Sequence, residues 1–150
     1  MSAGGSCAVS VTFKPTAKGT RKGNLTFTDD APTSPQIVAL AGTGTAIRLT
    51  PSSLTLGTVA VGNSSLPQTI TVTNVSGATV TFTSIGVAGL NPADFRISSN
   101  TCGATLAGGA SCNVGITFKP TATGTRKATL KLLDDGGGSP QTATLKAAGA

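Results

Sequence analysis

The sequence predicts an all-β chain, with one β-sandwich of about seven strands preceded by a three-strand fragment of a second sandwich. The composition is the first indication, because only 11% of the 150 residues are charged and Thr and Val, which favour strands, are abundant. Apolar and polar residues alternate in short segments, and no window shows sustained helical spacing. A long internal repeat is the third observation, and it sets the domain boundaries.

The repeat joins the two ends of the chain. The stretch "SCAVSVTFKPTAKGTRK" from Ser6 to Lys22 returns as "SCNVGITFKPTATGTRK" from Ser111 to Lys127, at an offset of 105 residues. The alignment continues without a gap to Gly44 and Gly149, and about half of its positions are identical. Residues 1–45 are therefore expected to be the C-terminal part of a truncated repeat, and residues 46–150 a complete one.

Alternation in the complete repeat predicts its strands. A clear case is the stretch 112–118, where Val114, Ile116 and Phe118 share one face. The alternation shifts near Ser84, which predicts a β-bulge. The expected strands are 54–62, 67–75, 78–87, 94–97, 112–118, 126–133 and 141–147. Short strands at this density, separated by turn residues, are typical of an immunoglobulin-like sandwich.

The truncated repeat predicts three strands with an uncovered apolar face. The strands are 7–13, 23–27 and 36–40, and the apolar residues are Val9, Val11, Phe13, Leu25 and Phe27. Three strands lie near the lower limit of independent stability. We expect self-association through residues 1–45, as a homodimer or a higher oligomer. Packing within one chain and partial disorder are the alternatives.

Several residue types are missing, and their absence narrows the function. The chain has no His, Trp or Tyr, which removes the commonest general base and metal ligand and the usual anchors of protein interfaces. We expect no catalytic residue, no metal and no cofactor. No apolar run is long enough to cross a bilayer, and the first residues, "MSAGGSC", do not resemble a signal peptide.

The stretch from Leu49 to Leu145 resembles a bacterial choice-of-anchor D repeat. The resemblance rests on "NTCG" and "LAGGASCNVGITFKPTATGTR" within 100–126 and on "SPQ" at 139–141, and it returns from Ser6 to Gly44. Such repeats belong to the ASH (abnormal spindle and hydin) class of immunoglobulin-like domains. The resemblance implies tandem arrays in large secreted or surface proteins, with neighbouring repeats as partners. It also implies a structural or interaction role without enzymatic activity.

The three cysteines are expected to differ in whether they form a disulfide. Cys102 and Cys112 flank a glycine-rich turn, and in a small extracellular β-domain a disulfide is their expected use. Two buried free thiols are the alternative. Cys7 is the copy of Cys112, and the copy of Cys102 would precede the first residue. We therefore expect Cys7 to be an unpaired thiol, either without a role or available for intermolecular pairing.

The net charge of +6 leaves a binding function open. A basic protein can bind an anionic glycan or a nucleic acid, although a solvated exterior is the simpler interpretation and nucleic acid is not the expected partner. The candidate anion-binding edge comes from the repeated "KPTA" and "GTRK" stretches, which are expected to form a turn. Its residues are Lys14, Lys18, Arg21, Lys22, Lys119, Arg126 and Lys127.

Paired carboxylates are the remaining candidates for chemistry. Asp29-Asp30 and Asp134-Asp135 follow strands and precede turn-forming residues. They match no calcium loop, and adjacent residues on a strand point to opposite faces. A turn role is the expectation, and a hydrolase with a site built at an oligomer interface is the least favoured alternative.

Overall fold

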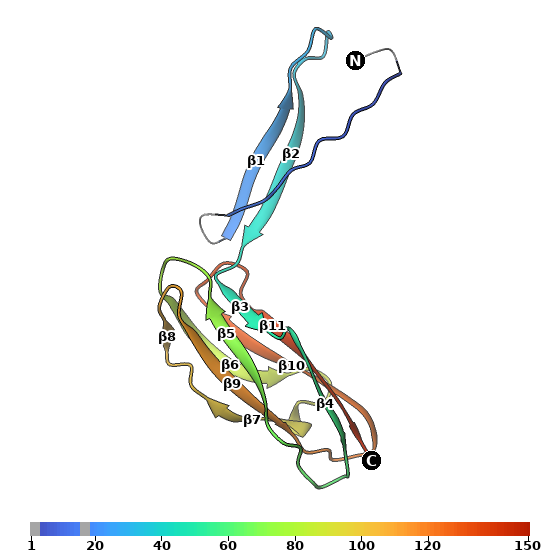
Figure 1. Ribbon diagram of the computed structural model, residues 1–150, viewed down its shortest axis with the longest axis vertical. Helices are drawn as coiled ribbons and strands as arrows, with labels where there is room; N and C mark the ends of the chain where they lie inside the picture. Colours follow the sequence, from blue (N-terminus) through green and yellow to red (C-terminus); the bar gives the residue numbers. More distant parts are fainter. Residues whose placement is uncertain (1–3, 16–18) are drawn as a thin grey trace.

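The complete repeat is a sandwich of two β-sheets, from which a β-hairpin projects (Figure 1). The computed structural model describes residues 4–15 and 19–150. One sheet has the order β4-β11-β10-β6-β8 and the other has the order β3-β5-β9-β7. The predicted all-β fold with an immunoglobulin-like sandwich is confirmed.

The complete repeat contains nine strands and one short 3-10 helix. The first sheet contains β4 (Ser53–Val59), β6 (Val80–Ala88), β8 (Thr105–Leu106), β10 (Gly124–Asp134) and β11 (Gln141–Gly149). The second contains β3 (Ile47–Thr50), β5 (Gln68–Asn74), β7 (Phe95–Asn100) and β9 (Ser111–Phe118). The 3-10 helix η1 (Pro92–Asp94) leads into β7.

The core lies between the two sheets and follows from the alternation. On β9, Val114, Ile116 and Phe118 are fully buried, and they face Leu130 and Leu145 from β10 and β11 within one cluster. Burying a side chain of this size stabilises the fold by about 1.5–3 kcal/mol. The bulge expected near Ser84 is confirmed, because Leu133 pairs with Ser84 while Asp134 pairs with Phe82.

The projecting hairpin repeats the geometry of β10 and β11. It consists of β1 (Gly19–Phe27) and β2 (Gln36–Gly44), whose ladder begins with Gly19 opposite Gly44. The ladder of β10 and β11 begins with Gly124 opposite Gly149, the copies of these two residues. The sequence repeat is therefore a structural repeat with the same register.

The prediction of a strand at 7–13 is wrong, because this segment is extended but pairs with no described strand. Its copy, β9, lies in the opposite sheet to β10 and β11, between β5 and β7. Partners equivalent to β5 and β7 are not present for residues 7–13. The segment crosses the face of the hairpin instead (Figure 1), with the Phe13 ring against Gly42.

Two further strands were missed by the sequence patterns. β3 has only four residues, and β8 has two. β8 is shorter than the four to eight residues over which alternation is recognisable, and β3 only reaches the lower limit of that span. In β3, Ile47 and Leu49 are nevertheless buried in the core.

Candidate functional site

A buried ion pair fixes one edge of the sandwich. Asp94 ends η1 and is 1% exposed, and its carboxylate binds the Nε of Arg126 on β10. Thr121 donates to Asp94 Oδ1 from its hydroxyl (2.7 Å) and from its backbone amide (3.1 Å). The amide of Lys119 donates to the Asp94 carbonyl oxygen at 2.8 Å. Asp94 thus holds the loop between β9 and β10 against η1.

The environment of Asp94 favours its ionised form. Burial by itself raises the pKa of this carboxyl, but hydrogen bonds from Thr121 and Arg126 and the positive charge of Arg126 outweigh it. The net effect is a pKa below the ordinary aspartate value. A carboxylate held in this way is an acceptor in a structural network and is poorly suited to proton transfer near neutral pH.

The only aspartate outside the two Asp-Asp pairs is Asp94, and the sequence patterns missed it. A signal was available in "NPADF", because Pro92 follows Asn91, a residue suited to start a short helix. The amide of Asn91 donates to the Lys127 carbonyl, and Asn91 Oδ1 accepts from the Lys127 amide. These bonds attach η1 to β10.

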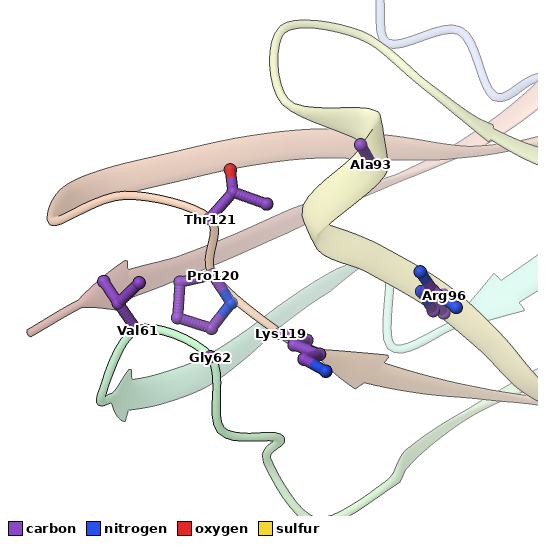
Figure 2. Close-up of a pocket in the computed structure, with 7 residues that line it drawn as sticks. All are labelled: Val61, Gly62, Ala93, Arg96, Lys119, Pro120 and Thr121. Carbon is purple, nitrogen blue, oxygen red and sulfur yellow. The ribbon is translucent and has the colours of Figure 1, made fainter.

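A pocket of about 330 Å³ lies beside this network and carries two cationic side chains (Figure 2). Arg96 and Lys119 lie on one side of it, and Val61 and Pro120 lie on the other. Both cations are exposed, so the surrounding water weakens their attraction for an anion. The polar side chains that line the pocket are those of Arg96, Lys119 and Thr121, and none of the lining residues is acidic.

The structure does not gather the candidate basic edge into one site. Arg126 points toward the interior side of β10, where it is bound to Asp94, while Lys127 lies on the outer face. Lys119 lines the pocket. Lys14, Arg21 and Lys22 are exposed on the N-terminal part, and Lys18 lies outside the described residues.

A different group of lysines shares one exposed face. Lys127 on β10 is directly opposite Lys146 on β11, and Lys131 lies on the same side of β10. Like charges in a directly opposite pair destabilise a sheet. The outward neighbours on these two strands are mainly threonines: Thr125, Thr129, Thr142 and Thr144.

The cysteines separate into a pair and a single thiol. Cys102 and Cys112 form a disulfide with a Cα–Cα distance of 5.0 Å. It connects the start of β9 to the loop after β7, so it closes the segment that contains β8. Cys7 is free and exposed.

The Asp-Asp pairs lie in two equivalent turns. The Asp29 amide donates to Ser34 Oγ, and the Asp134 amide donates to Ser139 Oγ, both at 2.9 Å. Asp29 Oδ1 accepts from the Ala31 amide in the same way that Asp134 Oδ1 accepts from Gly136. These contacts are those of aspartates that shape turns.

Residues 4–15 and 19–150 contain neither a metal-binding cluster nor a membrane-spanning helix. No group of three or more Cys, Asp, Glu or His side chains is placed to hold a metal ion. No helix in the same ranges has the length and apolar character needed to cross a membrane.

Solved structures resemble this chain chiefly in fold. The Vibrio cholerae VesB protease is 25% identical with a TM-score of 0.53, over 69% of this chain and 31% of that one. The secreted serine protease VesC from Vibrio cholerae is 25% identical with a TM-score of 0.52, and the match covers 71% of this chain and 23% of the protease. The chain thus spans less than a third of either protease. The ASH / PapD-like domain 7 of human CEP192 is 16% identical with a TM-score of 0.50, over 97% and 94%.

The family is shown by the sequence of the complete repeat. No curated protein matches the chain. The family model named ASH (abnormal spindle-like microcephaly-associated, ASPM-SPD-2-Hydin) matches residues 45–142, which form nearly all of the sandwich. The chain belongs to the ASH family of immunoglobulin-like domains.

Proposed function

We propose that this chain is a non-catalytic structural module from a tandem-repeat bacterial surface or secreted protein. The observation that carries the proposal is the repeated hairpin, in which β1 and β2 copy β10 and β11 residue for residue in register. Membership of the ASH family supports a module that contacts other protein domains. The Cys102–Cys112 disulfide supports an oxidising, extracellular compartment.

The partner of this module is proposed to be a second copy of the chain. Val9, Val11 and Phe13 are 53%, 54% and 50% exposed, whereas their copies Val114, Ile116 and Phe118 are fully buried. An exposed apolar patch of this kind marks an interaction surface.

The internal repeat indicates the shape that covers this face. In the complete repeat the same positions pack against the inner faces of further strands, so the uncovered face fits another sheet of the same kind. A second chain carries that surface, and two such faces related by a two-fold axis form a self-complementary contact.

Light scattering at a series of protein concentrations tests this assembly. We expect a dimer that the double variant Val11→Ser, Phe13→Ser converts into a monomer. Ile37→Ser is the matched control, because Ile37 is 59% exposed and lies on the other side of β2, where its copy Thr142 is exposed. A monomer at every concentration, or equal loss of the dimer with Ile37→Ser, contradicts the proposal.

A second candidate function is binding of an anionic glycan by the outer face of β10 and β11. The supporting observation is the directly opposite pair Lys127 and Lys146, with Lys131 four residues farther along the same face of β10. A bound polyanion would offset the repulsion between these two lysines, which have mainly threonines around them. The extracellular role proposed above favours a glycan over a nucleic acid.

Heparin affinity chromatography in rising salt tests the second candidate. We expect the unmodified chain to be retained at about 0.15 M salt. The double variant Lys127→Ala, Lys146→Ala should lose this retention, because fewer lysines then release counterions from the polyanion. The double variant Arg96→Ala, Lys119→Ala is the control and should be retained. Elution of the unmodified chain at low salt excludes this candidate. Equal retention on DNA shows general polyanion binding in place of glycan recognition.

A further inference from the structure

The hairpin and the sandwich are joined by a very short linker. β2 ends at Gly44 and β3 begins at Ile47, so only Thr45 and Ala46 lie between them. Ala46 is fully buried, and its amide donates to the carbonyl oxygen of Gly137 at 3.3 Å. The same carbonyl accepts from Gln141 Nε2 at 3.3 Å. The linker is therefore attached to the loop that connects β10 and β11.

That loop packs directly on the end of the hairpin. A Cβ atom at Gly137 would overlap the amide nitrogen of Gly19 and the carbonyl oxygen of Gly44. These two residues form the first pair of the β1–β2 ladder. The contact is backbone against backbone, so a side chain at residue 137 can be accommodated only if the hairpin and the loop move apart.

The two glycines beside Gly137 are also confined, although by side-chain atoms, and the nearest atom to a Cβ at Gly136 is Oδ1 of Asp134 in the same loop at 2.6 Å. A Cβ at Gly136 would lie 2.8 Å from the Cβ of Ala46, and one at Gly138 would lie 2.6 Å from Cγ2 of Thr45. Gly138 also has a φ of +83°, which disfavours other residues there. All three glycines therefore face the linker or the hairpin.

The equivalent loop of the hairpin shows that a turn of this kind does not by itself require glycine at positions 136 and 137. It contains Ala31, Pro32 and Thr33 at the positions of Gly136, Gly137 and Gly138. Both turns nevertheless share the hydrogen bond from the first aspartate amide to the serine hydroxyl. At Gly137, whose backbone is outside the left-handed region, only the contact across the junction explains the glycine.

We propose that the loop 136–138 is a docking element that holds the C-terminal end of the preceding repeat in one fixed orientation on the sandwich. Its partner is the pair of glycines that ends a repeat, here Gly19 and Gly44. The complete repeat ends on the same pair, Gly124 and Gly149, in the same register. The inference rests on the proposed tandem-repeat role and deepens it, since fixed junctions make an array a rigid spacer.

Residual dipolar couplings of backbone amides test the junction in the chain as it exists. We expect a single alignment tensor to fit residues 19–44 and 46–150 together. A need for two unrelated tensors in the unmodified chain overturns the inference. That outcome leaves the non-catalytic role and the second-copy contact unaffected, because light scattering tests that contact separately.

Gly137→Ala is the perturbing variant, because alanine is compatible with the backbone of residue 137 and only the approach of Gly19 and Gly44 excludes it. We expect the variant to need separate tensors for the hairpin and the sandwich, with unchanged couplings within the sandwich. Gly77→Ala is the matched control, because a Cβ at Gly77 meets nothing within 4 Å. A single shared tensor in Gly137→Ala also overturns the inference.

Discussion

The guanidinium of Arg126 binds the buried carboxylate of Asp94 and thereby joins β10 to η1. Arg126 is 20% exposed, so its charge is partly withdrawn from water. Its sequence copy, Arg21, is exposed on β1. One residue of the repeat thus has two environments, and the difference between them arises from the strands and loops that surround it.

The first prediction concerns this pair. Asp94→Asn should lower the free energy of unfolding by about 2–3 kcal/mol at pH 7, because Arg126 loses its buried partner. Chemical denaturation measures the change. Asp30→Asn is the control, since Asp30 is exposed, and its effect should stay within about 0.5 kcal/mol.

The same pair predicts a pH dependence. The pKa of Asp94 is lowered in the folded protein, so its stabilising effect is complete above the unfolded aspartate pKa of about 3.9 and is lost as pH falls through the lower folded value. The difference between the unmodified chain and Asp94→Asn should shrink over that interval. A constant difference from pH 7 to pH 2 contradicts the assignment.

A second prediction uses the repeat as its own control. Phe118→Ala should destabilise the sandwich by about 3–5 kcal/mol, because Phe118 is fully buried and its ring packs on Phe95 with centroids 4.9 Å apart. Phe13→Ala, at the equivalent position, should leave sandwich stability nearly unchanged because Phe13 is half exposed. Thermal unfolding of the two variants measures both effects, and equal losses contradict the prediction.

The disulfide supplies a third prediction. In a Cys7→Ser background, which prevents exchange with the free thiol, Cys102→Ser with Cys112→Ser should lower stability by about 2–3 kcal/mol, because the loop between them has about ten residues. Cys7→Ser alone should have almost no effect, since Cys7 is exposed. Urea denaturation of the three proteins checks both statements, and full stability without the disulfide refutes the first.

The buried side chain of Asn74 leads to a fourth prediction. Its Nδ2 donates to the carbonyl oxygens of Ala78 and Leu106, each at 2.8 Å, and its Oδ1 accepts from Ser76. Asn74→Ala should cost about 2–4 kcal/mol, because these buried groups lose their partners. Asn63→Ala, at an exposed position, is the control and should be nearly neutral by the same urea measurement.

Local patterns were sufficient for most of the sandwich. Alternation identified the long strands and their inward faces, because a buried face requires an apolar residue at every second position, as at Val114, Ile116 and Phe118 on β9. It failed at β8, which has two residues and is defined by its pairing with β6. It also failed at 7–13, where an alternating segment had no partner strands to bind.

The candidate site was less accessible to such patterns. The residues of the predicted basic edge lie close together in the sequence, but Arg126 and Lys127 point to opposite faces of β10. The role of Asp94 is not visible in local patterns, because its partners Thr121 and Arg126 are distant from it along the chain. Burial and long-range partners, which determine charge behaviour, are properties of the folded chain.

The all-β class, the repeat and its register follow from the amino-acid sequence alone, because they depend on local alternation and on identity between Ser6–Gly44 and Ser111–Gly149. The environment of each copy depends instead on the strands that pack around it after folding. Phe118 became core and Phe13 remained half exposed, because the complete sandwich surrounds Phe118 whereas Phe13 packs only on the two-stranded β1–β2 hairpin. The constraint on Gly137 likewise depends on the tertiary structure, since its backbone contact with Gly19 and Gly44 exists only after folding.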